Sequence, residues 1–327
     1  MATSRIGRLA LIGLAIGGFL PAASAGTIDA IYAFGDSLSD VGNVFIATGG
    51  AEPAPPYSNG QFSNGPIWIQ DLAAKFGVAP LHPSLAGGTD YAFGGAETGP
   101  ETFNTANPAT DLTAQVAQFG AAHPVADPNA LYTIWIGSND LSDILTGALP
   151  TQYPGDIGAA VTNVDASIGA LAADGAKRLL IVTVPDLGKT PGAIAGGPSV
   201  QAGASFLAAN FDNALVTSAL SLAGSDGLHL SILDTYSLLD GIVANPSLYG
   251  FANVTAPCLT GEVNFAGGTP CSNPSQFLFW DTDHPTAAGH LIVADAADAV
   301  VTPEPASVSL LAVGLLGAAL VFRRRRV

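Results

Sequence analysis

Positively charged side chains are scarce in this chain. Its 327 residues include ten Lys and Arg against 26 Asp and Glu, a formal net charge of −16. Residues 1–25 and 302–327 hold six of the basic residues and one acid, so residues 26–301 keep four basic and 25 acidic residues, a net charge of −21. A surface of this sign repels phosphate backbones and disfavours anionic lipid headgroups, which excludes nucleic-acid binding.

The proportion of charged residues is low, and no cofactor-binding motif occurs. Charged residues make up 11% of the chain and apolar residues 48%, which excludes a disordered chain. With 39 Gly and 23 Pro, the composition predicts a compact fold rich in loops. The sequence contains no metal-ligand cluster, no Gly-rich phosphate loop and no dinucleotide fingerprint. We therefore expect no cofactor.

Residues 1–25 have the pattern of a secretory signal peptide. Arg5 and Arg8 precede an apolar run over 9–20, and Ala23-Ser24-Ala25 supplies an Ala-x-Ala cleavage site, so we expect cleavage before Gly26. The alternatives are a membrane anchor or a buried helix, but the run is short for a membrane span. The pattern predicts export through the inner membrane.

Residues 302–327 form a second patterned end. Pro303-Glu304-Pro305 leads into an apolar stretch over 307–322, which is closed by four arginines at 323–326. This order resembles the PEP-CTERM sorting signal of Gram-negative bacteria, which implies a short transmembrane helix and processing by an exosortase-type membrane protease. The alternative is a plain tail anchor that stays attached. In both cases the arginines should remain cytoplasmic, which predicts an exported domain in the periplasm, at the cell surface or secreted.

Only two cysteines occur, Cys258 and Cys271, in a stretch rich in Gly, Pro, Asn and Thr. Two thiols without histidine neighbours make a poor zinc site. In an exported protein an even number of cysteines favours a disulfide, and here it would close a long loop. We expect this disulfide to be structural rather than catalytic.

The region between the two ends predicts one α/β domain, residues 26–301. Apolar, β-branched runs typical of buried strands cover 28–34, 131–136, 179–184 and 228–233. Between them lie Ala-rich stretches with helical spacing at 111–119, 156–173 and 200–222, and the Gly-containing segment 173–178 is typical of a helix end. Alternating strands and helices predict a parallel sheet with helices on both faces. Ligands of such sheets bind at the carboxyl ends of the strands.

Two polar side chains follow predicted strands. Ser37 comes directly after the first strand in Gly35-Asp36-Ser37-Leu38, and Asn139 follows the second in Gly137-Ser138-Asn139-Asp140. Either residue alone is typical of a helix cap or a turn. Because the carboxyl ends of parallel strands share one edge of the sheet, we expect both side chains at that edge.

A histidine near the end of the domain supplies the base that a nucleophilic serine requires. His284 lies in Asp281-Thr282-Asp283-His284-Pro285, and an aspartate three residues earlier can fix the tautomer of the imidazole. Asp283 is a competing partner, but its adjacency to His284 makes the ring edge hard to reach. The other histidines, among them His290, have no such carboxylate, and we expect them to be solvated or packed.

These three segments, taken together and in this order, resemble the conserved blocks of the GDSL/SGNH hydrolases, in their bacterial lipase/esterase branch. The resemblance covers about residues 28–298. It extends to 62–68, to the second block at 91–96, and to 185–191 and 249–255. The chain departs from the family at Asp90, where an Asn is frequent.

The resemblance implies a three-layer α/β/α sandwich of flavodoxin-like type with a mainly parallel five-stranded sheet. It implies that Ser37 is the nucleophile, His284 the base and then the acid, and Asp281 its orienting partner. The oxyanion hole would consist of the Ser37 and Gly95 amides and the Asn139 side chain, with Gly94 as the alternative to Gly95. The implied activity is that of an ester hydrolase on an ester or lipid substrate.

Other functions remain open on the sequence. The same residues suit a carbohydrate acetylesterase, or an acyltransferase acting on an exopolysaccharide. An apolar acyl chain is suggested instead by aromatic residues that are either cavity walls or ordinary core: Phe45, Tyr57, Phe62, Trp68 and Phe251. A binding protein that keeps the fold without catalysis would be expected to have lost one of the three residues, and all three are present.

Overall fold

The computed structural model describes residues 27–99 and 108–302, which lie within a compact unit spanning Thr27–Pro303. The predicted signal peptide and C-terminal transmembrane helix lie outside the described residues. Within the described part of the chain, no helix combines the length and the apolar character needed to cross a membrane.

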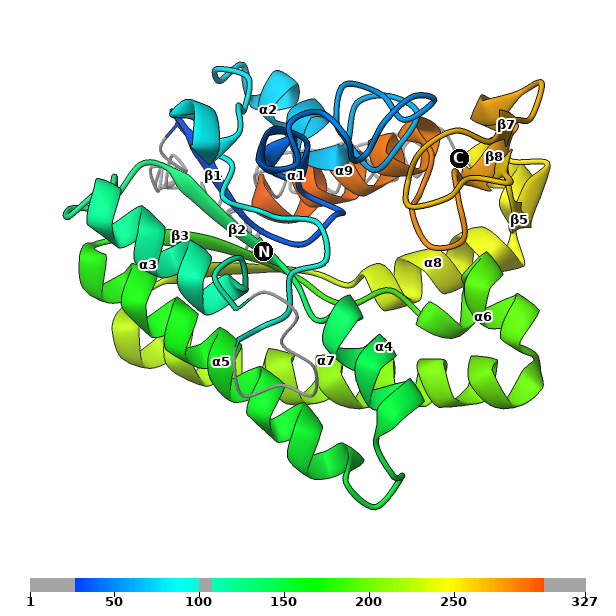
Figure 1. Cartoon of the computed structure of the whole chain (residues 1–327). Helices are drawn as coiled ribbons and strands as arrows, with labels where there is room; N and C mark the ends of the chain where they lie inside the picture. Colours follow the sequence, from blue (N-terminus) through cyan, green and yellow to red (C-terminus); the bar gives the residue numbers. More distant parts are fainter. Residues whose placement is uncertain (1–26, 100–107, 303–327) are drawn as a thin grey trace, which may run out of the picture. The chain divides into compact units, whose positions relative to one another are not determined.

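A parallel sheet of four strands forms the centre of the fold (Figure 1). Its strands, in spatial order, are β1 (Ile31–Gly35), β2 (Leu131–Trp135), β3 (Arg178–Val182) and β4 (His229–Leu233). All four overlap the apolar runs that predicted them, and β1 and β3 each extend one residue beyond, to Gly35 and Arg178. The side chains of β2 are all buried, whereas β4 at the edge is partly exposed.

The expectation of a five-stranded sheet is wrong. Residues 89–93 occupy the position beside β1, where the Ala33 amide donates to the Thr89 carbonyl and the Tyr91 amide to the Ala33 carbonyl. This segment nevertheless forms only an isolated bridge to β1, between Ala33 and Asp90. The Asp90 carboxylate accepts from the amides of Val41 and Ala92, which curls the backbone around its own side chain and prevents a regular ladder.

Helices cover both faces of the sheet, which confirms the predicted three-layer α/β/α arrangement (Figure 1). One face packs against α2 (Trp68–Phe76) and α9 (Ala287–Val301), and the other against α3 (Leu112–Ala122), α5 (Tyr153–Asp174) and α7 (Pro198–Asp226). Side chains alternate between the faces: within β1, Ala33 joins the α2/α9 core and Phe34 the α3/α5/α7 core. Both faces are therefore shielded from water, as parallel sheets require.

Shorter elements cluster along the chain just after the strands. The segments that follow β1 to β4 contain α1 (Asn43–Ala47), α4 (Ser138–Gly147), α6 (Pro191–Gly196) and α8 (Thr235–Ala244). The 3₁₀ helices are η1 (Ser84–Ala86), η2 (Leu187–Lys189), η3 (Pro246–Tyr249) and η4 (Pro274–Gln276). Beyond the main sheet, β5 (Asn253–Pro257) pairs with β8 (Phe277–Phe279), and β6 (Leu259–Thr260) with β7 (Thr269–Pro270).

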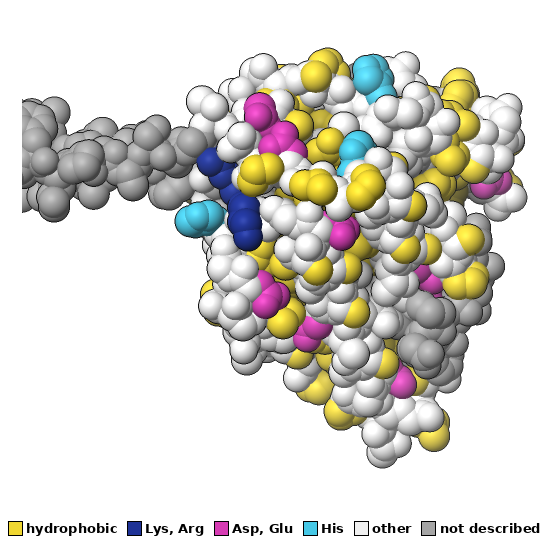
Figure 2. Space-filling view, turned by 90° about the vertical axis from the view of Figure 1, so that its left-hand side faces the viewer, with side chains coloured by type: hydrophobic (Ala, Val, Ile, Leu, Met, Phe, Trp, Pro, Cys, Tyr) yellow, Lys and Arg dark blue, Asp and Glu magenta, His cyan; other side chains and the backbone are white. Residues whose placement is uncertain are grey.

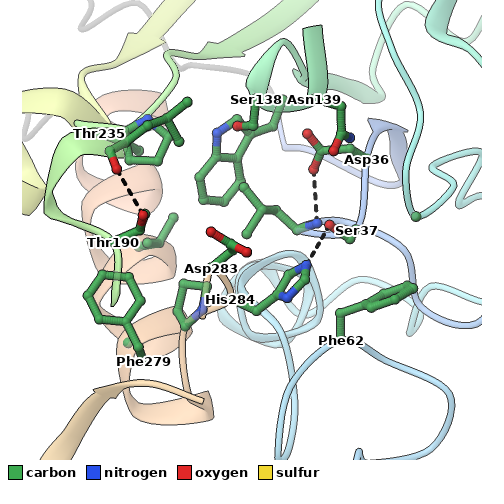
Figure 3. A pocket seen from close by; sticks show the side chains of 18 of the residues that line it. Asp36, Ser37, Phe62, Ser138, Asn139, Thr190, Thr235, Phe279, Asp283 and His284 are labelled. Carbon is green, nitrogen blue, oxygen red and sulfur yellow. Dashed lines mark hydrogen bonds between the residues drawn. The ribbon is translucent and has the colours of Figure 1, made fainter. Parts of the chain in front are cut away.

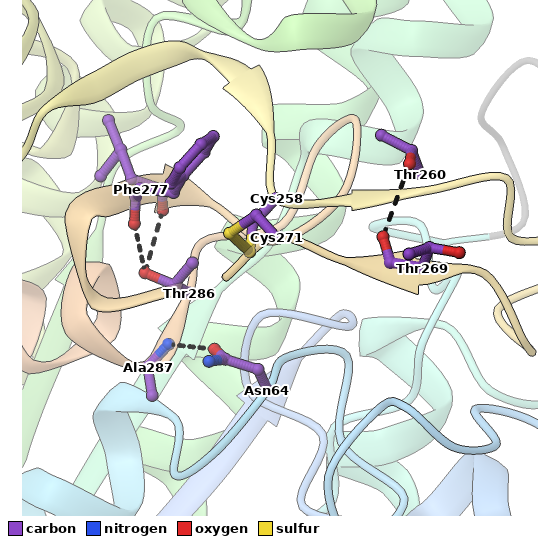
Figure 4. Close-up of a disulfide and its surroundings, with 9 residues drawn as sticks. Asn64, Cys258, Thr260, Thr269, Cys271, Phe277, Thr286 and Ala287 are labelled. Atoms are coloured by element: carbon purple, nitrogen blue, oxygen red, sulfur yellow. Dashed lines mark hydrogen bonds between the residues drawn. A yellow bond between two sulfur atoms is a disulfide. The ribbon is translucent and has the colours of Figure 1, made fainter. Parts of the chain in front are cut away.

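The β6–β7 pair is an antiparallel hairpin closed by a disulfide. Cys258 precedes β6 and Cys271 follows β7, and their sulfur atoms are bonded (Figure 4). We call residues 258–271 the disulfide hairpin. At its tip the Ala54 amide donates to the Phe265 carbonyl and the Gly267 amide to the Pro55 carbonyl, so the disulfide hairpin holds the long loop that precedes α2.

The surface reflects the acidic composition. On the face drawn in Figure 2, Asp and Glu side chains are spread among hydrophobic and polar ones, whereas Lys and Arg side chains gather at one place. The described residues contain four cationic side chains: Lys75, Lys177, Arg178 and Lys189.

Candidate active site

Ser37 lies just beyond the carboxyl end of β1, in a sharp turn. Gly35 ends the strand with φ +151°, and a Cβ at this position would stand 2.1 Å from the Trp135 carbonyl oxygen of β2. Only glycine fits there, and the chain leaves the sheet directly after it. Ser37 is partly exposed and lines a cavity at the edge of the sheet, as the sequence predicts.

His284 lies in the loop between β8 and α9. The Trp280 amide donates to the His284 carbonyl at 2.8 Å, which closes the loop locally. Two hydrogen bonds join this loop and the start of α9 to the segment before α2. Ser63 Oγ donates to the Pro285 carbonyl, and the Ala287 amide donates to Asn64 Oδ1. Figure 4 shows the second of these bonds. The imidazole therefore has a fixed position facing Ser37 (Figure 3).

Ser37, His284 and Asp281 form a continuous chain of hydrogen bonds. His284 Nε2 lies 2.7 Å from Ser37 Oγ, and His284 Nδ1 lies 2.8 and 3.0 Å from the two carboxylate oxygens of Asp281. Asp283 is not part of this chain, because its exposed carboxylate accepts from Thr282 Oγ1. The geometry thus brings the imidazole to Asp281 and leaves Asp283 at the rim.

The pKa values of the pair favour a positive charge on the imidazole. Burial alone would raise the pKa of Asp281, but the charge and hydrogen bonds of His284 outweigh it, and the pKa lies below its ordinary value. Burial alone would lower the pKa of His284, but the Asp281 carboxylate outweighs it, and the pKa lies above its ordinary value. A proton taken from Ser37 would therefore be stabilised on the ring.

His290 lacks the properties that a catalytic base needs. It is buried in α9, and burial together with the neighbouring His284 lowers its pKa to about 3. It is therefore neutral and packed, one of the two outcomes expected from the sequence.

Three hydrogen-bond donors surround the Ser37 side of the cavity. The Ser37 and Gly95 amides donate to no acceptor among the described residues, and Gly95 has φ +78°, a backbone conformation suited to glycine. The Gly94 amide, by contrast, donates to the buried Asp40 carboxylate at 3.0 Å. Asn139, in the first turn of α4, uses one side-chain N–H on the Ala96 carbonyl at 2.8 Å and keeps a second N–H.

Sequence reasoning missed three aromatic contacts around the triad. The Tyr57 hydroxyl donates to Asp281 Oδ2 at 2.8 Å. Phe62 stacks on the His284 ring with centroids 5.3 Å apart, and Phe265 meets the same ring edge-on at 5.8 Å. Tyr57 and Phe62 stood out in the sequence only as aromatics. Phe265 lies in a Gly-rich loop with no local signal, so only the tertiary fold reveals it.

The cavity around Ser37 has a volume of about 310 Å³ and mostly apolar walls. Of the five aromatic residues suggested as cavity walls, only Phe62 lines it. Trp68 and Phe251 are core residues, and Tyr57 packs against Trp280 and the disulfide. Among the described residues, no group of three or more His, Cys, Asp or Glu is arranged to hold a metal ion.

Comparisons with known proteins found similar chains among esterases and lipases. An esterase, EstA, from Pseudomonas aeruginosa is 33% identical, over 84% of this chain and 47% of its own length. A GDSL esterase/lipase from Arabidopsis thaliana is 29% identical, over 82% of this chain and 85% of its own. The chain spans about half the length of the Pseudomonas relatives it matches.

Among solved structures, an acetylxylan esterase from Geobacillus stearothermophilus, Axe2, is 14% identical, over 85% of this chain and 97% of its own, with a TM-score of 0.45. The PEP-CTERM protein-sorting motif matches residues 301–326, so the chain carries this motif. The model of the GDSL-like lipase/acylhydrolase family matches residues 31–297. The chain therefore belongs to the GDSL-like lipase/acylhydrolase family.

Proposed function

We propose that this protein is a serine hydrolase of carboxylic esters, with Ser37 as nucleophile, His284 as base and Asp281 as orienting partner. The observation that carries the proposal is the hydrogen-bonded chain from Ser37 Oγ through His284 to Asp281, with contacts of 2.7 and 2.8 Å. This is the arrangement that activates a serine hydroxyl, because the base lies within reach of the nucleophile and a carboxylate fixes the tautomer of the base. No cofactor takes part in the proposed reaction.

The proposed reaction is acyl transfer in two halves. Ser37 Oγ attacks the ester carbonyl carbon as His284 Nε2 takes its proton, and the proton then passes to the departing alcohol oxygen. The acyl group remains on Ser37 until a water molecule, deprotonated by His284, attacks it and releases the acid. The negative oxygen formed in each half accepts hydrogen bonds from the Ser37 and Gly95 amides and from Asn139. Gly95 is preferred to Gly94 because the Gly94 amide already donates to Asp40.

The substrate is proposed to be a lipid-like ester rather than an acetylated carbohydrate. The apolar lining of the cavity supports this choice, since sugar rings need polar partners on several sides. The carbohydrate acetylesterase and the non-catalytic binding protein are the alternatives that the experiment below tests. Acetylated xylan beside the alkyl esters separates the first of these from the proposal.

The two ends of the chain are proposed to direct its export and sorting. Residues 1–25 would direct export through the inner membrane, 26–301 would form the hydrolase domain, and 302–327 would anchor it transiently by a transmembrane helix. The sorting motif supports an exosortase-type processing enzyme as partner. The domain would then act in the periplasm, at the cell surface or outside the cell.

Hydrolysis of p-nitrophenyl butyrate by the purified full-length protein tests the function. We expect Ser37→Ala to reduce activity to background and to abolish labelling by an organophosphonate. Asn139→Ala should lower kcat by about 10²–10³ through loss of one oxyanion donor. Asn210→Ala is the matched control, because its exposed side chain makes a similar bond to a carbonyl, that of Phe206. A folded protein that hydrolyses neither butyrate nor acetylated xylan, and resists the phosphonate, would favour the binding protein.

A further inference from the structure

The cavity extends to both sides of Ser37. Figure 3 shows Phe62 on one side of the Ser37–His284 pair, and Thr190, Thr235 and Phe279 on the other. We call the second side the apolar arm. Its walls come from α8 and β8, where four cavity-lining residues pack in one apolar cluster: Leu239, Ile242, Leu278 and Phe279.

The two sides differ in enclosure. These four residues of the apolar arm are each 7% exposed or less, although they line the cavity. On the other side, Phe265 is 39% exposed and Glu52 is partly exposed, so this side opens to solvent at the tip of the disulfide hairpin. Figure 3 places the exposed Asp283 and the hydroxyls of Thr190 and Thr235 on the same side as Phe279. That side therefore offers a buried apolar wall with polar groups beside it, whereas the other side is open and partly polar.

The order of steps in the proposed reaction indicates on which side of the cavity the acyl group and the alcohol of an ester should bind. The alcohol leaves first and needs a way out, whereas the acyl group stays bonded to Ser37 Oγ until water releases it. We propose that the apolar arm binds the acyl chain of an uncharged ester, while the alcohol lies toward Phe62 and Phe265. This inference rests on the proposed hydrolase function and names its substrate class.

The charges around the cavity support an uncharged substrate. Its ionisable lining residues are Asp36, Glu52, Asp283 and His284, and none of the described lining residues is Lys or Arg. The only ionisable side chains that an anionic ester would meet in the cavity are carboxylates and one imidazole. That imidazole must be neutral to act as a base. Acidic polysaccharides and anionic phospholipids are therefore disfavoured at this site.

Ile242 is the cavity-lining residue of α8 that lies furthest along the chain from β4. The residues of α8 that line the cavity are Thr235, Leu238, Leu239 and Ile242, which follow one face of the helix. Thr235 comes just after β4, and Ile242 lies seven residues further on, about 10 Å along the helix axis. A side chain at 242 thus limits how far an acyl chain can extend, and its size should determine the preferred chain length.

Two ester series measured on the full-length protein test the inference. In p-nitrophenyl esters from acetate to palmitate we expect kcat/KM to rise about fourfold per methylene until the arm is filled. In alkyl butyrates of growing alcohol length the rise should be smaller. Ile242→Trp should lower the octanoate-to-acetate ratio of kcat/KM at least tenfold, and Ile242→Ala should move the optimum to longer chains. Leu291→Trp, at an exposed position in α9, is the control and should keep the wild-type profile.

Each contrary result has a distinct meaning. A chain-length profile that is unchanged in Ile242→Ala, which removes volume and introduces no clash, would overturn the apolar arm as the acyl site even if Ile242→Trp failed to fold. A stronger dependence on alcohol length than on acyl length would reverse the assignment of the two sides and overturn the inference. Hydrolysis of no ester by the folded wild-type protein would overturn the proposed function itself.

Discussion

The Asp281 carboxylate accepts hydrogen bonds from four donor groups. Besides His284 Nδ1, its carboxylate receives the Asp283 amide at 2.9 Å, the His284 amide at 2.7 Å and the Tyr57 hydroxyl at 2.8 Å. The two amides come from its own loop, whereas Tyr57 comes from a segment 224 residues away in sequence. Tyr57 is thus the long-range contact that holds the carboxylate against the imidazole.

Removal of the Tyr57 hydroxyl should change the pH dependence of hydrolysis. His284 acts as a base only when neutral, so activity rises with pH through its pKa, which Asp281 already raises. In Tyr57→Phe the Asp281 charge has one donor fewer and stabilises the imidazolium more strongly, so the acid limb of kcat/KM should move to higher pH. At pH 7, kcat should fall about tenfold, the equivalent of a hydrogen bond to a charged group.

The control for Tyr57→Phe is Tyr132→Phe, which removes a hydroxyl bonded to the Asp127 carbonyl before β2, away from the site. We expect KM to stay the same in both variants, because neither tyrosine lines the cavity. An acid limb and a kcat that match the wild type in Tyr57→Phe would contradict a positioning role.

At the scale of elements, the disulfide hairpin supports the triad from outside the sheet. Its backbone holds Ala54 and Pro55, and three residues after Ala54 the chain reaches Tyr57. Phe265 at its tip contacts both the Tyr57 ring, at 6.0 Å, and the His284 ring. The hairpin has few strand residues of its own, so we infer that the disulfide, more than the ladder, keeps it in place.

Loss of the disulfide should therefore reduce both stability and activity. A disulfide that closes a loop of this size is worth about 3 kcal/mol, so the double variant Cys258→Ser/Cys271→Ser should unfold at lower denaturant concentration. Its kcat should fall because Tyr57 is held less firmly. Dithiothreitol should reproduce this fall in the wild type and have no effect on the variant. Full activity of the reduced wild type would show that the hairpin does not support the site.

At the scale of the whole molecule, buried carboxyl groups make stability depend on pH. Burial is the largest cause in each case: it raises the pKa of Asp36 and Asp40 to about 6, of Asp140 to about 7 and of Asp212 to about 8. A carboxyl whose pKa is higher in the folded than in the unfolded chain stabilises the fold fully below about pH 4. That stability is lost as the pH rises through the folded-state pKa values, here from about 6 to about 8. Repulsion within the acidic chain acts in the same direction.

We expect the melting temperature to fall by roughly 5 °C or more between pH 5 and pH 8. Differential scanning calorimetry at constant ionic strength measures this. Asp212→Asn should flatten the slope at the alkaline end, because an amide oxygen can still accept from the Val184 amide without titrating. Asp143→Asn is the control, since Asp143 is partly exposed. A melting temperature that rises between pH 5 and pH 8 would contradict the role of these carboxyls.

Several elements could be predicted because short-range sequence patterns identify them. Strands β1 to β4 are apolar, β-branched runs, and such runs are stable only when buried on both faces. The end of α5 at Asp174, followed by Gly175 with φ +111°, was indicated by the Gly-containing segment before β3. Local sequence could not show that the expected fifth strand is absent. Whether residues 89–93 form a ladder with β1 depends on what the Asp90 side chain binds.

Local sequence patterns were enough to predict the strands, the order of the three short blocks and the position of Ser37 and Asn139 at one edge of the sheet. These follow from short-range patterns and from the geometry of parallel strands. The tertiary structure was needed to show that the Gly94 amide is occupied and the Gly95 amide is not, and that residues of α8 and β8 line the apolar arm. Both depend on contacts between segments far apart in the chain, such as the Gly94 amide and Asp40, 54 residues apart. No local pattern encodes such contacts, since they exist only once the packed layers bring the loops together.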